Sequence, residues 1–172
     1  MADTFPIKTI AVVGAGVMGA GIALNAAMNG FKVVLYDINQ EVLDKATKYF
    51  EKFLSTSVEK GKITADAKTK MLASIHNTTQ ITDVKGEFIV EAILENLALK
   101  QKVLKEIEAQ NHPTCIIASN TSTIPITRIA NGMARPKQVV GMHFFNPAPL
   151  MKLIEVIPGI ETAPEITETT IA

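Results

Sequence analysis

Three glycines with the spacing G-x-G-x-x-G separate an apolar run from a helical pattern, and this arrangement strongly restricts the fold. They are Gly14, Gly16 and Gly19. Residues 9–13, which precede them, are short and apolar, as in a buried strand. Residues 17–29 are small and apolar, and Asn29-Gly30 is a favourable place for a helix to end. A strand that turns through glycines into a helix is the usual opening of a β-α-β unit.

Strand-like and helical patterns alternate along the rest of the chain. We expect strands at residues 9–13, 32–36, 88–90, 115–118, 139–145 and 153–157, and helices at residues 17–29, 39–60, 64–74 and 96–110. Continuous apolar strands are typical of parallel sheets that are covered on both faces. The pattern therefore predicts an α/β fold of the Rossmann type, with a doubly wound, mostly parallel sheet and helices on both faces.

Length and composition exclude several classes of protein. The chain has 172 residues, which suits one domain spanning residues 1–172, and its 17 Lys and Arg balance 17 Asp and Glu. A balanced charge creates no field that would attract nucleic acid or an anionic membrane. The glycines interrupt the apolar stretch 9–28, so it predicts neither a signal peptide nor a membrane span. Cys and His lack the spacing of metal ligands.

The single cysteine and the last residues of the sequence bear on location and completeness. Cys115 cannot form a disulfide within the chain, which suits the reducing cytoplasm. Residues 162–172 begin a new helical pattern, with Pro164 near its first turn. Because the chain ends inside this pattern, we expect it to be truncated.

Asp37 indicates which dinucleotide the glycine turn would bind. It ends the second predicted strand, where a carboxylate accepts hydrogen bonds from a ribose diol and repels a 2′-phosphate. The N-terminus of the helix after the glycines favours a pyrophosphate. These features predict NAD rather than NADP. The alternative is a purely structural glycine turn, with Asp37 as a helix cap.

His143 and Glu155 form a possible acid–base pair. Oxidation of an alcohol requires a base that takes the hydroxyl proton, and histidine titrates in the useful range. His143 ends an apolar run, and ligands bind at the carboxyl ends of parallel strands. Glu155 lies in an apolar run, where a buried carboxylate needs a partner such as His143. The alternative, equally open, is a solvent-facing Glu155 and a structural His143.

Two weaker features concern the substrate. Residues 119–123 are Ser-Asn-Thr-Ser-Thr and follow a predicted strand, so Ser122 could hydrogen-bond a substrate oxygen, or this cluster could cap a helix before Pro125. Lysines on the helix 39–60, including Lys60, could meet the phosphates of a large anionic substrate. A solvated helix face explains these lysines more simply.

Four blocks resemble the N-terminal domain of the 3-hydroxyacyl-CoA dehydrogenase family, which includes bacterial 3-hydroxybutyryl-CoA dehydrogenases. They are residues 14–23, 91–96, 119–122 and 143–149, the last reading His-Phe-Phe-Asn-Pro-Ala-Pro, and the similarity covers residues 8–157. The resemblance implies an oxidoreductase of fatty acid or butanoate metabolism that interconverts 3-hydroxyacyl-CoA and 3-oxoacyl-CoA with NAD.

The resemblance also implies roles for individual residues. His143 would be the general base, Glu155 would orient it, and Ser122 would hydrogen-bond the substrate oxygen. The cofactor-binding residues would be Gly14, Gly16, Val17, Met18, Gly19, Asp37, Glu95, Lys100 and Asn146. Lys60 would reach the coenzyme A part of the substrate.

The sequence departs from the family at its C-terminal end. In the family a helical second domain follows, closes over the acyl-CoA and makes most of a homodimer, and this chain does not contain it. We therefore expect this domain to bind NAD(H) but to turn over weakly. Two other interpretations remain, namely an NAD-dependent dehydrogenase of a hydroxy acid without CoA, and a non-catalytic NAD(H)-binding module.

Overall fold

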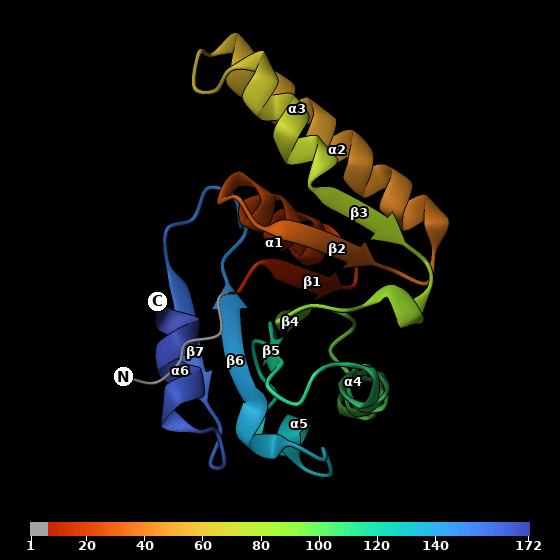
Figure 1. Cartoon of the computed structure of the whole chain (residues 1–172), viewed down its shortest axis with the longest axis vertical. Coiled ribbons are helices and arrows are strands. Elements are labelled where there is room, and N and C mark those ends of the chain that lie inside the picture. The colour runs from red at the N-terminus through yellow and green to blue at the C-terminus, as the bar shows by residue number, and fades with distance from the viewer. Residues whose placement is uncertain (1–6) are drawn as a thin grey trace.

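A seven-stranded sheet forms the centre of the molecule in the computed structural model, which describes residues 7–172 (Figure 1). The first six residues of the predicted domain lie outside the described residues. The strands are β1 Thr9–Val13, β2 Lys32–Tyr36, β3 Ile75–Thr78, β4 Phe88–Glu91, β5 Ile116–Ser119, β6 Val139–Phe144 and β7 Ile154–Pro158. Their order across the sheet is β3-β2-β1-β4-β5-β6-β7, and all neighbours are parallel except β6 and β7.

Helices cover both faces of the sheet. They are α1 Val17–Met28, α2 Gln40–Glu59, α3 Ala65–Ala73, α4 Leu97–Gln110, α5 Ile126–Ala130 and α6 Pro164–Ile171, with 3-10 turns η1 Ile81–Asp83 and η2 Pro136–Gln138. Helices α1, α2 and α6 contribute to one buried apolar cluster, and α4 and α5 contribute to the other. Helices α2 and α3 pair as an arm that projects beyond the sheet (Figure 1).

Alternation along the strands produces the two clusters. In β1, Val12 belongs to the cluster under α1, whereas Ala11 and Val13 belong to the cluster under α4. Successive side chains of a strand point to opposite faces, so a strand covered on both sides is apolar throughout. The predicted Rossmann-type α/β fold is therefore confirmed.

The predicted element boundaries are close to the observed ones, with local differences. Asn39 caps α2 through a side-chain hydrogen bond to the N–H of Glu41, as its position predicts. Strands β5 and β7 begin and end one residue later than expected, and β6 ends one residue earlier. The sequence pattern does not reveal α5, because five residues are too few to show helical periodicity.

The sheet order positions the functional site. The chain runs outward from β1 to β3 in one direction and from β4 to β6 in the other, so the order reverses between β1 and β4. In open α/β sheets, ligands bind in the crevice beyond the carboxyl ends of the strands at such a reversal. The glycine turn follows β1, and Ala92 and Ile93 follow β4 at this place.

Candidate active site

The three glycines have three different structural requirements. A Cβ on Gly19 would lie 1.7 Å from the carbonyl oxygen of Gly14, so the helix packs directly on the turn. Gly14 has a φ of +97°, and its Cβ would lie 2.8 Å from the carbonyl oxygen of Ala92. A Cβ on Gly16 would meet nothing within 4 Å. Gly16 is therefore not needed for packing, and its missing side chain leaves open space beside the start of α1.

This open space fits a pyrophosphate. Gly16 is the N-cap of α1 and makes no side-chain cap hydrogen bond, so no side chain satisfies the first N–H groups of the helix there. Free N–H groups and the helix dipole favour an anion at this end. Val17 and Met18, which are predicted to bind the cofactor, form the first turn of α1 at this end, and Val17 is largely exposed. The residues present therefore suit a dinucleotide.

Asp37 lies beside a pocket of about 350 Å³ that Gly14, Gly16 and the residues after β4 also line. Its Oδ2 accepts a hydrogen bond from the N–H of Ala15 at 2.8 Å, and its Oδ1 accepts one from Asn39 at 3.0 Å. Asp37 thus faces the glycine turn and has carboxylate lone pairs left for a ribose diol. The alternative of a helix cap does not hold, since Asn39 caps α2.

His143 connects Glu155 and Ser122. Its Nδ1 lies 2.8 Å from Oε2 of Glu155, and its Nε2 lies 3.0 Å from Oγ of Ser122. The ring of Phe145 packs edge-on against the imidazole, with 4.9 Å between ring centroids. One nitrogen is held by a carboxylate and the other faces a hydroxyl, which is the geometry of an oriented general base.

Burial is not what pairs Glu155 with His143. The Glu155 side chain is 51% exposed, on edge strand β7, so the premise that it is a buried carboxylate was wrong. The two residues lie directly opposite each other in the antiparallel β6–β7 pair. Opposite residues of such a pair have neighbouring side chains, so the strand register brings the carboxylate to the ring.

Glu95 holds the loop that carries Ser122. Its Oε1 accepts hydrogen bonds from the hydroxyl of Thr121 and from both the N–H and the hydroxyl of Thr123, at 3.3 and 3.1 Å for the latter two. Its Oε2 lies 3.2 Å from Nζ of Lys100. Ser122 is thus flanked by two residues that the same carboxylate binds.

Lys100 lies under this loop instead of at the surface. Its side chain is 1% exposed, and its Nζ contacts Oε1 of Glu91 at 2.6 Å as well as Glu95. The expected contact of Lys100 with NAD stays a prediction. In this structure its ammonium links two carboxylates, because a buried charge requires charged partners.

We predict that Glu95 makes stability depend on acid pH. Burial alone would raise the pKa of Glu95, but hydrogen bonds from Thr121 and Lys100 and the charge of Lys100 lower the pKa from 4.5 to about 2. Because the pKa is lowered, ionised Glu95 stabilises the fold above pH 4.5, and this contribution is lost as the pH falls toward 2. The unfolding free energy of Glu95→Gln should therefore decrease less than that of the parent across this pH range.

Urea unfolding at a series of pH values measures this effect. Glu168→Gln in α6, an exposed glutamate far from any such network, is the control and should leave the pH dependence unchanged. An equal pH dependence in Glu95→Gln and the parent would contradict the prediction.

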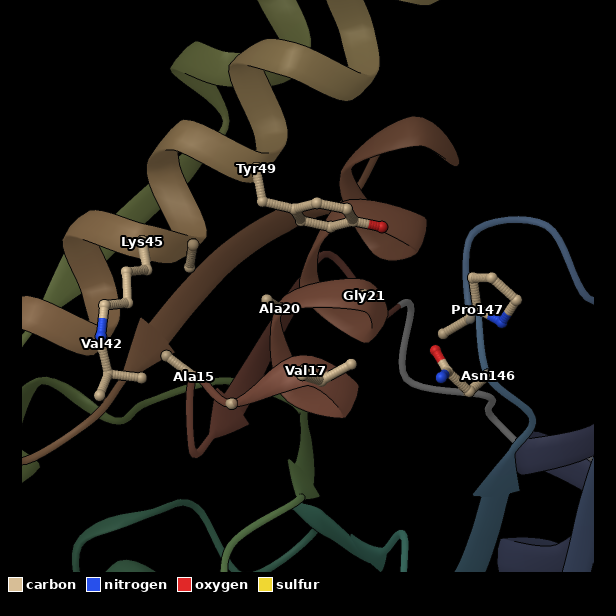
Figure 2. A pocket seen from close by; sticks show the side chains of 12 residues that line it. Ala15, Val17, Ala20, Gly21, Val42, Lys45, Tyr49, Asn146 and Pro147 are labelled. Atoms are coloured by element: carbon tan, nitrogen blue, oxygen red, sulfur yellow. The ribbon is translucent and has the colours of Figure 1, made fainter.

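A second pocket, of about 390 Å³, lies between α1, α2 and the segment after β6 (Figure 2). Asn146 and Pro147 border it on one side, and Tyr49 reaches from α2 across α1 toward them. Among the described residues that line it, Lys45 alone is charged. Asn146 thus lines the same pocket as Gly16, which also lines the pocket beside Asp37, and its contact with the cofactor stays a prediction.

Lys60 lies away from these pockets. It is the C-cap of α2, at the outer tip of the arm that α2 and α3 form (Figure 1). It follows Tyr49 by eleven positions along α2, which corresponds to about 16 Å at the α-helical rise per residue. Its contact with a substrate stays a prediction that only a long ligand could satisfy.

Within residues 7–172, no group of three or more His, Cys, Asp or Glu side chains is arranged to hold a metal ion. In the same part of the chain, no helix combines the length and the apolar character needed to cross a membrane.

Comparison with known proteins identifies the family. Residues 9–172 match the family described as "3-hydroxyacyl-CoA dehydrogenase, NAD binding domain". The chain belongs to this family. Its predicted family and its NAD cofactor are thereby confirmed.

Individual relatives agree with this assignment. A "Probable 3-hydroxybutyryl-CoA dehydrogenase" of Deinococcus radiodurans is 48% identical over 163 residues, 92% of this chain and 58% of the relative. A "Fatty acid oxidation complex subunit alpha" of Psychrobacter cryohalolentis is 43% identical over 96% of this chain and 23% of the relative. The crystal structure of 3-hydroxybutyryl-CoA dehydrogenase from Escherichia coli K12 has a TM-score of 0.93 and 39% identity, and the similarity covers 95% of this chain and 35% of that one. The relatives are therefore longer than this 3-hydroxyacyl-CoA dehydrogenase domain.

Sequence reasoning missed two residues of the site in this domain. Glu91 received no role, although it ends a buried strand as a fully buried carboxylate. Its position at the end of an otherwise apolar run was the available signal, since an enclosed carboxylate needs partners. Asn120 was also missed, and its Oδ1 accepts the N–H of Phe144 at 2.9 Å. This bond ties the Ser122 loop to the strand that carries His143.

Proposed function

We propose that the protein containing this domain interconverts 3-hydroxyacyl-CoA and 3-oxoacyl-CoA with NAD. The observation that carries the proposal is the contact of His143 with both Glu155 and Ser122, near the carboxyl end of β6 and at the same edge of the parallel sheet as the glycine turn. This geometry suits removal of a hydroxyl proton, which a hydride-transfer reaction on an alcohol requires.

Each residue of the trio has a distinct task in this proposal. NAD, when bound, supplies the acceptor for the hydride that leaves the alcohol carbon. His143 takes the hydroxyl proton on Nε2, the nitrogen that faces Ser122. Glu155 accepts the hydrogen bond of Nδ1–H, which fixes the tautomer and stabilises the charged ring. Ser122 donates its hydroxyl hydrogen to the substrate oxygen and keeps this oxygen near His143.

The pocket between α1 and α2 is where we place the thioester arm of the substrate. Its lining is mostly apolar, and Asn146 connects it to the segment that follows His143. Asn25 donates a hydrogen bond to the carbonyl of Ala148 at 3.0 Å, so this segment is held against α1. Lys45 supplies a positive charge for an anionic group, and Lys60 would meet the far end of an extended CoA.

The rest of the whole protein completes the site in this proposal. Because the matched relatives are longer, we propose that a helical second domain closes over the acyl-CoA and forms a homodimer, in the cytoplasm. This domain alone then binds NAD(H) and turns over slowly, because a half-open site positions the acyl-CoA poorly.

Oxidation of NADH with stoichiometric domain tests the function. We expect slow, single-turnover loss of NADH absorbance with acetoacetyl-CoA and none above background with acetoacetate. Lys45→Met should weaken acetoacetyl-CoA binding about three- to tenfold, as expected for loss of one partly exposed charge contact. Lys48→Met, an exposed lysine of α2 outside the pocket lining, is the matched control.

The other outcomes separate the alternatives. Equal rates with acetoacetyl-CoA and acetoacetate would favour a dehydrogenase of hydroxy acids without CoA. Tight NADH binding with no turnover of either compound, even when the longer protein is used, would favour a non-catalytic NAD(H)-binding module.

A further inference from the structure

Beneath the Ser122 loop lie two buried charged residues in contact, Glu91 and Lys100. Glu91 has no role in the function proposed above. Glu91 is 0% exposed and Lys100 is 1% exposed, and their charged atoms lie 2.6 Å apart. Oε2 of Glu91 accepts the hydroxyl of Ser119 at 2.6 Å, and Oε1 also accepts the N–H of Ile93 at 2.7 Å. Glu91 therefore joins the ends of β4 and β5 to α4, which carries Lys100.

The chain of contacts continues to the reacting groups. The ammonium of Lys100 contacts Glu91 and also Oε2 of Glu95. The other carboxylate oxygen of Glu95, Oε1, accepts hydrogen bonds from Thr121 and Thr123, on both sides of Ser122. The hydroxyl of Ser122 then reaches Nε2 of His143 at 3.0 Å. Each contact in this series is an ion pair or a hydrogen bond, so the series links Glu91 to the loop that carries Ser122.

Stability alone is a poor explanation for such a pair. Removing two charges from water costs several kcal/mol per ion, and apolar residues of similar volume often serve a core as well or better. A buried ion pair can be retained when it fixes the position of functional groups. Here the contacts of the pair lead to the loop that carries Ser122, and the position of this loop determines the Ser122–His143 contact.

We propose that Glu91 and Lys100 are positioning residues that hold Glu95, and through it the 119–124 loop, so that Ser122 faces His143. The proposal rests on the proposed function, in which Ser122 binds the substrate oxygen. The Ser122–His143 contact itself can be measured without turnover. Neither residue touches the reacting atoms. Their task is to fix the donor that meets the substrate oxygen.

The test uses the double variant Glu91→Gln with Lys100→Met in the domain. The Glu91→Gln change keeps an acceptor for the N–H of Ile93 and a partner for the Ser119 hydroxyl. The Lys100→Met change fills the space of the lysine stem, so no unpaired charge stays buried. We expect a melting temperature close to the parent's. We also expect the ring ¹⁵N signals of His143 to move most of the way to those of Ser122→Ala, which has no hydroxyl at this position.

Ligand binding gives a second readout. The dissociation constant of NADH should rise about tenfold, the effect of weakening one charge-assisted contact in the site. The dissociation constant of ADP should stay the same, because ADP needs only the glycine turn and the Asp37 pocket. Glu95→Gln, whose side chain is 41% exposed and is not needed for packing, should shift the His143 signals in the same direction.

The control is a buried carboxylate of the same kind outside the site. Glu108 is 4% exposed, lies 3.5 Å from Nε of Arg135 and accepts the N–H groups of Ala134 and Arg135. Glu108→Gln should lower the melting temperature and leave the His143 signals unchanged. Parent-like His143 signals in the double variant would overturn the proposal, whether or not the parent binds NADH. The proposal would also be overturned if the double variant had a lower melting temperature, like the Glu108→Gln control, and lost NADH and ADP binding equally.

Discussion

Replacing His143 by alanine is expected to slow single-turnover NADH oxidation by about 10²–10⁴-fold, the usual contribution of a general base. NADH binding should change little, because the glycine turn and the Asp37 pocket lie on other strands. The other two histidines lie elsewhere, His76 on edge strand β3 and His112 before the start of β5. Stopped-flow absorbance with stoichiometric domain measures the rate, and fluorescence titration measures binding.

A second histidine variant provides the control. His76 is exposed on β3, at the opposite edge of the sheet from β7, so His76→Ala should leave both rate and binding unchanged. Glu155→Gln should give a smaller loss than His143→Ala, since the amide oxygen still accepts Nδ1–H but no longer stabilises the charged ring. A His143→Ala variant that keeps the parental rate would remove His143 from the mechanism.

Local patterns made the first half of the site predictable. Gly14, Gly16 and Gly19 lie in a single strand–turn–helix unit, and their spacing is visible in the sequence even though the close approach of Gly14 is to Ala92 after β4. Asp37 follows the next strand at a fixed spacing, so its place beside the turn follows from the β-α-β geometry. Motifs of this kind can be recognised from their local spacing alone.

The second half of the site depends on tertiary pairing, which spacing does not determine. His143 and Glu155 meet because β7 turns back antiparallel to β6 in one register, and a shift by one residue would send Glu155 to the other face. The burial argument reached the right pair from a wrong premise, since Glu155 is half exposed.

Lys100 shows a different limit of sequence reasoning. Family resemblance placed it at the cofactor, but its place under the loop depends on Glu91, which lies on a separate element. A charged residue on a helix is usually solvated, so only the packing of α4 against β4 reveals that this one is enclosed. Residue type and position thus indicated where Lys100 lies but not that two carboxylates enclose it.

Alanine substitutions at Gly16 and Gly19 should separate cofactor binding from folding. In Gly16→Ala the new Cβ meets no protein atom within 4 Å, so the melting temperature should stay near the parent's. The same Cβ occupies the space beside the α1 N-terminus, where a pyrophosphate must approach the backbone closely. NADH binding should therefore weaken by about 100-fold or more, equivalent to about 3 kcal/mol of lost contacts and steric overlap.

Gly19→Ala should act on the fold first. Its Cβ would lie 1.7 Å from the carbonyl oxygen of Gly14, and the clash is with backbone, which no side-chain rotation can relieve. Overpacking of this kind costs about 1–3 kcal/mol or more, so the midpoint of urea unfolding should fall clearly. Parallel unfolding curves and NADH titrations of the two variants measure both effects. If Gly16→Ala bound NADH as the parent does, the pyrophosphate would have to lie elsewhere, although Gly19 would still be required for packing.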